Sequence, residues 1–141
     1  DALGLRFGRD YVAMYDSTMA RFWFLERGAE DRIRDLLHHE ERGRVLSDAD
    51  LAAFGCDFPD RRYGHLIFLA RAGVLICPSS MGQRTMAGMH GYDPADVAST
   101  ALFATNLPLE RMPRRLDDLH GVMLDAVDPQ VRSASTLEVC A

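Results

Sequence analysis

The sequence lacks the features that several broad classes of protein need. It contains no apolar run near 18 residues, so we expect no membrane span, and no signal peptide opens it. Its three cysteines are odd in number and form no CxxC pair, which predicts no disulfide framework and favours a reducing compartment such as the cytoplasm. Lysine is absent, and the formal net charge of -5 argues against a nucleic-acid-binding module.

Sequence motifs of common catalytic mechanisms are missing as well. There is no Gly-rich P-loop, and Ser17, Ser79 and Ser80 lack the GxSxG context of a serine nucleophile. The chain begins with Asp1 rather than Met, which we interpret as a sign of processing or truncation. The sequence contains enough apolar residues to form the core of one domain, because 48% of the 141 residues are hydrophobic.

The hydrophobic pattern predicts a mixed α/β or α+β unit. Aromatic and β-branched residues predict strands at 11–15 and 20–25, the second covered on both faces because its apolar residues are consecutive. The spacing of Ile33, Leu36 and Leu37 predicts a helix over 29–39, with Gly43 as its stop. The pattern further predicts a short helix from the N-cap Ser47 to Gly55, a hairpin of 65–70 and 73–77, a strand at 99–104 and a helix over 114–127.

Two segments have no regular pattern. Residues 78–94 are dominated by Gly, Ser and Met, and loops of that length are uncommon in compact domains unless they are functional or disordered. Residues 130–141 lack a strong pattern, and we expect a frayed tail after a domain that spans residues 1–129.

His90 is the candidate site residue of the long irregular segment. It lies in Met89-His90-Gly91-Tyr92-Asp93-Pro94, just ahead of the predicted strand at 99–104, so we expect its imidazole at a sheet edge where it could bind a metal. A zinc site needs three or four ligands, and the chain offers one such group, so the site would be incomplete. The alternative is an ordinary turn in which Asp93 caps the local backbone.

Other polar groups have plainer interpretations. His38-His39-Glu40-Glu41 occupies adjacent helical positions that diverge around the axis, which favours a solvated face. His65 and His120 are interpreted as packing or surface residues. The arginines of Asp60-Arg61-Arg62-Tyr63 could bind a phosphate or a carboxylate, although surface ion pairing is the favoured reading.

Three ordered segments resemble the alkaline phosphatase superfamily. They are residues 15–24, residues 58–69, and the His90 turn with residues 99–103. The turn is similar to the last metal-ligand motif of the type I phosphodiesterase and nucleotide pyrophosphatase branch. The resemblance covers roughly residues 11–127.

The resemblance implies that the chain is the C-terminal portion of a large α/β domain, a mixed sheet flanked by helices. It implies that His90 is a zinc ligand and that Gly91 and Tyr92 shape its turn. Enzymes of this family use a Thr or Ser nucleophile and two metal ions held by upstream Asp and His residues, and this chain has no match to those motifs. The implied cofactor is zinc, the substrate of the complete protein is a phosphate ester, and the missing N-terminal part is the implied partner of this chain, which we expect to be inactive alone.

Two other functions stay open. The chain could be a stand-alone, non-catalytic module derived from that fold. It could also belong to a phosphoglycerate mutase-like phosphotransferase, which shares the core of the superfamily and differs in its upstream ligands.

Overall fold

The computed structural model describes residues 3–106, 108–109 and 111–127. The chain divides into two compact units, Asp1–Thr100 and Ala101–Ala141. The predicted tail at 130–141 lies outside the described residues. Within the described part of the chain, no helix is long and apolar enough to cross a membrane.

The first unit is built on a four-stranded antiparallel sheet. Its strands are β1 (Tyr11–Tyr15), β2 (Met19–Phe24), β3 (Gly43–Val45) and β4 (Leu66–Ala70). Their order in the sheet is β1-β2-β4-β3. Tyr15 pairs with Ala20 across a tight turn between β1 and β2, and β4 lies between β2 and β3. The coarse prediction of a mixed α/β unit is therefore confirmed.

The helices of the first unit follow local signals in the sequence. Helix α1 (Ala29–His38) carries Glu30 and Asp31 in its first turn, where acidic residues complement the helix dipole. Helix α2 (Asp48–Ala53) begins at Ser47, whose hydroxyl and backbone form a capping box with Asp50. A single 3-10 turn, η1, covers Val97–Ser99. Both predicted helices of this unit, over 29–39 and after Ser47, are confirmed.

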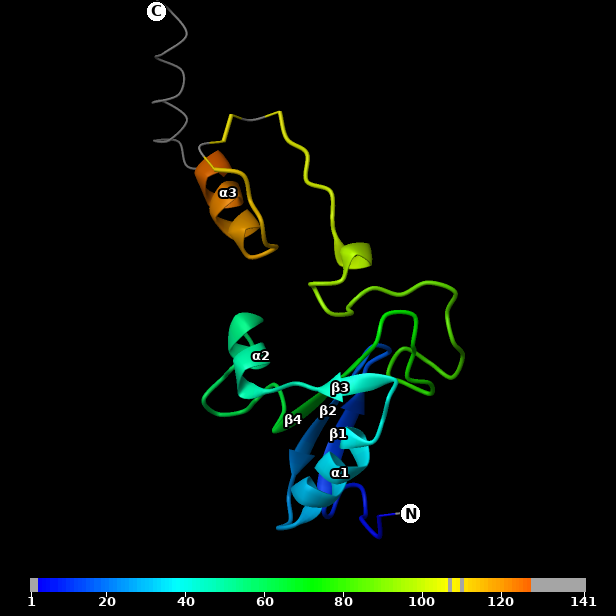
Figure 1. Cartoon of the computed structure of the whole chain (residues 1–141). Coiled ribbons are helices and arrows are strands. Elements are labelled where there is room, and N and C mark those ends of the chain that lie inside the picture. The colour runs from blue at the N-terminus through cyan, green and yellow to red at the C-terminus, as the bar shows by residue number, and fades with distance from the viewer. Residues whose placement is uncertain (1–2, 107, 110, 128–141) are drawn as a thin grey trace, which may run out of the picture. The chain divides into compact units, whose positions relative to one another are not determined.

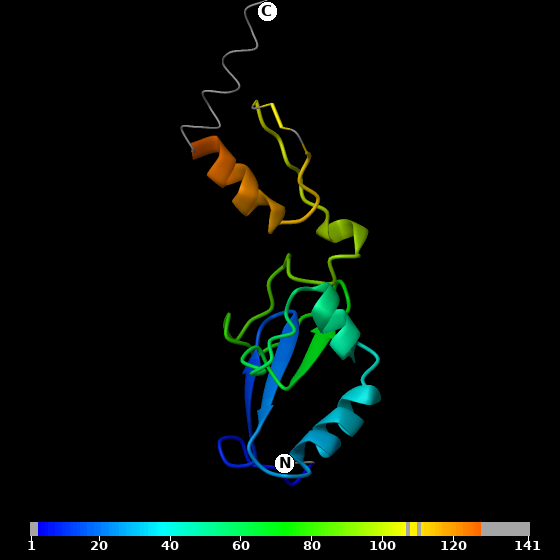
Figure 2. The same cartoon turned by 90° about the vertical axis from the view of Figure 1, so that its left-hand side faces the viewer.

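One face of the sheet packs on α1. Figures 1 and 2 show α1 lying along one side of the sheet, and Ile33 of α1 belongs to its main core cluster. Every residue of β4 is buried, as expected for a central strand covered on both faces. In β2 only alternate residues are buried, so the prediction that this strand is covered on both faces is correct only in part. The core cluster consists of Ala20, Phe22, Ile33, Leu66 and Phe68.

The predicted hairpin of 65–70 and 73–77 is wrong in its second half. Residues 73–77 form no strand, because the two edges of β4 are already paired with β2 and β3. The sequence does not predict β3, because Gly43 is interpreted as the residue that ends the preceding helix. Instead, Gly43 pairs with Ala70, and its lack of a side chain leaves room for the Phe68 ring.

The predicted strand at 99–104 is also wrong. Asp96 caps the η1 turn by accepting a hydrogen bond of 2.8 Å from the backbone N–H of Ala98, and the chain continues without strand pairing. In the second unit, helix α3 (Asp118–Val127) begins later than the predicted residue 114. The Asp118 carboxylate accepts hydrogen bonds from the backbone N–H groups of Arg114 and Arg115, which lie just before the helix.

We expect Gly43→Ala to destabilise the first unit by about 1–3 kcal/mol, the usual cost of overpacking. An added Cβ would lie 2.5 Å from the Leu69 carbonyl oxygen and 2.6 Å from Cε1 of Phe68. Urea unfolding measures the loss. The matched control is Gly88→Ala, whose added Cβ meets nothing within 4 Å and should change the unfolding free energy by less than about 0.5 kcal/mol. Equal effects of the two variants would contradict this packing account.

Candidate functional site

The β1–β2 turn holds the long irregular segment that contains His90. The backbone N–H of Ile76 donates to the Ser17 carbonyl at 2.8 Å, and that of Ser80 donates to the Tyr15 carbonyl at 2.7 Å. The hydroxyls of Ser17 and Ser79 share a hydrogen bond of 3.3 Å. Figure 1 shows the segment as a green loop near this turn. The loop is therefore docked on the sheet although it contains little regular structure.

The turn that carries His90 is anchored at three points. The buried Thr18 hydroxyl donates to the Gly91 carbonyl at 2.9 Å. The Tyr92 hydroxyl donates to the Val74 carbonyl at 3.1 Å, and the Arg44 guanidinium donates to the Asp93 carboxylate at 2.9 Å. These contacts join positions far apart in the chain, so the sequence contains no local signal for them. Thr18, Arg44 and Val74 are the residues of this site that sequence reasoning missed.

Gly91 meets two requirements that another residue would not. Its φ is +93°, a backbone conformation that favours glycine. An added Cβ would lie 3.0 Å from the Thr18 hydroxyl oxygen, the atom that bonds the Gly91 carbonyl. The turn can therefore approach the sheet this closely only with glycine at this position.

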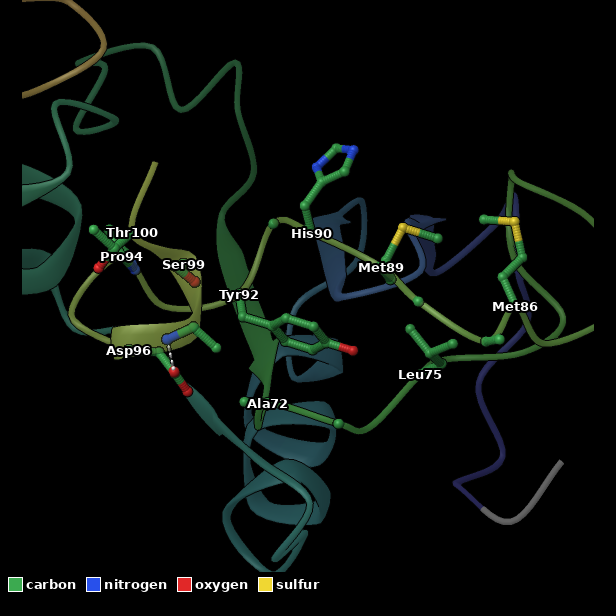
Figure 3. Close-up of a pocket in the computed structure, with 15 residues that line it drawn as sticks. Ala72, Leu75, Met86, Met89, His90, Tyr92, Pro94, Asp96, Ser99 and Thr100 are labelled. Atoms are coloured by element: carbon green, nitrogen blue, oxygen red, sulfur yellow. Dashed lines mark hydrogen bonds between the residues drawn. The ribbon is translucent and has the colours of Figure 1, made fainter. Parts of the chain in front are cut away.

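His90 itself is exposed and lines a cavity of about 690 Å³. Figure 3 shows its imidazole on the opposite side of the backbone from the Tyr92 ring. The imidazole has no hydrogen bond to any described residue, so its nitrogens are free to bind a ligand. The side chains of Leu75, Met86 and Met89 also line the cavity and give it a largely apolar wall.

The surroundings of His90 do not complete a metal site. Among the described residues, no group of three or more His, Cys, Asp or Glu side chains could hold a metal ion. The expected position of His90 ahead of a strand is wrong, because residues 99–104 form none. His90 instead projects from a loop docked on the β1–β2 turn. It can supply one imidazole donor, and the other donors of a zinc site would have to lie beyond the described residues.

The remaining histidines lie on other elements of the chain. His65 accepts a hydrogen bond of 3.0 Å from the backbone N–H of Phe24 through its Nδ1, and His39 contacts the Asp35 carbonyl at 2.8 Å. His38 is exposed on α1, and His120 lies on α3 in the second unit. Among the described residues, none of these histidines forms part of a group of three metal-capable side chains.

The arginines at positions 61 and 62 are engaged in surface ion pairs. Arg61 contacts Asp48 at 3.1 Å, and Arg62 contacts the Asp60 carboxylate at 2.9 Å. The hydrogen bonds from the Arg62 side chain and backbone lower the pKa of Asp60. This arrangement matches the favoured reading of surface ion pairing.

Two carboxylates share the Arg44 guanidinium. Arg44 contacts Asp50 at 2.8 Å and Asp93 at 2.9 Å. The Arg44 hydrogen bond, followed by one from the Ala95 backbone, lowers the pKa of Asp93. Hydrogen bonds from the side chain and backbone of Ser47, and then from Arg44, lower the pKa of Asp50 to about 2. Both carboxylates are therefore ionised at neutral pH, opposite one cation.

The lowered pKa of Asp50 predicts an acid-sensitive contribution to stability. An unfolded Asp has a pKa of about 3.9, so the contribution is fully present above that pH and is lost as the pH falls toward the folded value of about 2. We expect Asp50→Asn to be less stable than the wild type at pH 5, and the two unfolding free energies to converge by pH 2. Urea unfolding at several pH values measures this, with Asp35→Asn, an exposed carboxylate past the first turn of α1, as the control. A difference that stays constant between pH 5 and pH 2 would contradict the assignment.

We expect Gly91→Ala to destabilise the protein by more than the roughly 1–2 kcal/mol that the left-handed backbone alone would cost. The added methyl group also presses on the Thr18 hydroxyl at 3.0 Å. Gly73→Ala is the matched control, because Gly73 also has a positive φ, +83°, but an added Cβ there meets nothing within 4 Å. Urea unfolding compares the two variants. If Gly91→Ala costs no more than Gly73→Ala, the close approach to Thr18 is unimportant.

Comparison of this chain with known proteins found no relative. No protein-family model, no curated protein and no solved structure matches this chain at a significant level. The assignment to the alkaline phosphatase superfamily therefore stays a prediction that rests on three sequence segments. The role of His90 as a zinc ligand is likewise a prediction.

Proposed function

We propose that this chain is the C-terminal portion of a zinc-dependent phosphoesterase of the alkaline phosphatase superfamily, close to the type I phosphodiesterase and nucleotide pyrophosphatase branch. His90 contributes one ligand to a zinc ion. The complete protein hydrolyses a phosphate monoester or diester, and the nucleophile and the other metal ligands come from the N-terminal part of the same domain.

The observation that supports this proposal is the contrast between the His90 turn and the His90 side chain. The turn is held by contacts from Thr18, Val74 and Arg44, while the imidazole has no hydrogen bond to any described residue. A metal ligand needs a rigid backbone and a free donor atom, because looseness of the supporting structure weakens coordination. His65, in contrast, uses its Nδ1 to accept a hydrogen bond from the Phe24 backbone N–H.

The chemistry of the donor suits zinc, which commonly binds imidazole nitrogen. In such enzymes the bound ions activate the nucleophile, stabilise the leaving oxygen and neutralise charge that develops on the phosphoryl group. Within this chain, Thr18, Val74 and Arg44 would hold the turn so that His90 keeps one orientation. The chain alone supplies neither nucleophile nor a complete ligand set, so hydrolysis requires the complete protein.

One observation favours the stand-alone module as a second candidate. The sheet unit, Asp1–Thr100, has its own core and its own helix capping, which a small independent binding domain also needs. This module would bind no zinc. Sequencing the reading frame upstream of Asp1 separates the two, because an enzyme requires Asp, His and Thr or Ser metal-site motifs there.

We expect His90→Ala to lower the zinc content of the complete protein and its hydrolysis of bis-p-nitrophenyl phosphate together. Loss of a direct ligand should weaken zinc binding by more than the 10- to 100-fold that is typical for an outer-shell partner. Elemental analysis and chelator competition measure the loss. His38→Ala, which removes an exposed histidine of α1, is the control and should retain zinc and activity. Unchanged zinc content in His90→Ala would refute the ligand assignment.

A further inference from the structure

The β1–β2 hairpin has a second face, opposite the face that packs on α1. Side chains alternate across a strand, so the residues between the core positions of β1 and β2 share this second face. The register places Met14 opposite Arg21 and Val12 opposite Trp23. Val12 and Met14 are exposed, with 37% and 41% of their surfaces accessible. We call this surface the hairpin face, and its residues are Val12, Met14, Asp16, Arg21 and Trp23.

Arg21 is the cation of the hairpin face, and it is incompletely paired. Only 14% of its side chain is exposed, and its buried Nε has no hydrogen-bond partner among the described residues. Its Nη2 donates to the Met14 thioether sulfur at 3.0 Å, which is a weak acceptor. The guanidinium carbon lies 4.7 Å from the centroid of the Tyr63 ring, a cation–π contact. Because buried charges are normally paired with an opposite charge, this guanidinium lacks its strongest kind of partner.

Among the described residues, Asp16 is the carboxylate that approaches Arg21, but it lies too far away for a hydrogen bond. Its Oδ2 is 3.9 Å from Nη2 of Arg21, and 36% of its side chain is exposed. Its Oδ1 accepts only a long hydrogen bond of 3.5 Å from the Ser80 hydroxyl. The hairpin face therefore carries a cation and an anion side by side, each with unused hydrogen-bonding capacity.

The two donors of Arg21 that lack a strong acceptor belong to one edge of the guanidinium. The N–H groups of Nε and Nη2 on that edge point in parallel, and such a pair matches the two oxygens of a carboxylate. The Met14 side chain is flexible and exposed, so an incoming carboxylate can displace its sulfur from Nη2. Trp, Tyr, Met and Arg are also the residue types that are enriched in protein–protein interfaces. A carboxylate carried by a protein surface therefore suits this face.

We propose that the hairpin face is a self-association surface and that its occupant is a second copy of this chain. A two-fold interface repeats every contact, so Arg21 of each copy binds Asp16 of the partner subunit. The two reciprocal pairs supply charge complementarity, and the exposed Val12 and Met14 side chains supply apolar area around them. This inference goes beyond the proposed function, because it involves neither His90 nor zinc.

Sedimentation equilibrium of the 141-residue chain in the presence of a reducing agent tests the proposal. We expect the wild type to show a monomer–dimer equilibrium. Arg21→Glu and Asp16→Arg each bring like charges together across the interface, so each should weaken the dimer by about 10-fold or more. An equimolar mixture of the two variants should associate again, because the mixed dimer pairs opposite charges at both positions.

Arg34→Glu is the matched control. It makes the same change of charge as Arg21→Glu, but on α1, which packs on the other face of the sheet. Its dimer should stay within about threefold of the wild-type affinity. Trp23 is the only tryptophan of the chain, so its emission should move to shorter wavelength as the protein concentration rises. Asp16→Arg and the Trp23 signal keep the test decisive even if Arg21→Glu does not fold.

Three results would overturn the proposal. The first is a wild-type chain that sediments as a monomer up to about 1 mM. The second is a dimer that is equally strong in the wild type and in Asp16→Arg, because association then uses another surface. The third is a mixture of Arg21→Glu and Asp16→Arg that stays monomeric although both variants are folded, because Asp16 and Arg21 then interact within one chain and not between copies.

Discussion

The fold around His90 depends on the tight turn between β1 and β2. Ser17 and Thr18 are buried there, and their polar groups bind segments that arrive much later in the chain. The Ser17 carbonyl accepts from Ile76, the Thr18 carbonyl accepts from Ala70, and the Thr18 hydroxyl donates to Gly91. Buried polar groups must be paired, so each of these bonds also satisfies a group that would otherwise be costly to bury. These hydrogen bonds hold the backbone of the irregular segment in a defined position on the turn.

This attachment explains how a loop without strands can hold a defined backbone next to His90. The Gly91 carbonyl reaches Thr18 because glycine allows both the backbone angle and the close approach. Asp93 is held separately by Arg44 of β3. Two elements of the same sheet therefore hold the turn on either side of Tyr92. His90 lies just before these fixed points and remains exposed.

Much of the fold could be predicted from local patterns. Strands β1, β2 and β4 follow their apolar and β-branched residues, and α1 and α2 follow helical spacing and the Ser47 cap. The errors arise at two apolar runs that pair with no strand of the sheet. Residues 73–77 and 99–104 have strand-like composition, but the former find both edges of β4 paired and the latter follow a turn capped by Asp96. Strand formation is decided by available edges, which composition does not describe.

The sequence by itself determined the local elements and singled out His90, because helical spacing, capping residues and a Gly-flanked histidine are short-range properties. Only the tertiary structure decided what holds that histidine. Thr18, Arg44 and Val74 meet the His90 turn across long sequence separations, and no periodicity or motif encodes such pairs. The sequence predicts that His90 lies at a sheet edge, whereas in the tertiary structure it lies in a loop docked on the β1–β2 turn. The physical reason is that hydrogen-bond partners of irregular backbone are chosen by the fold as a whole.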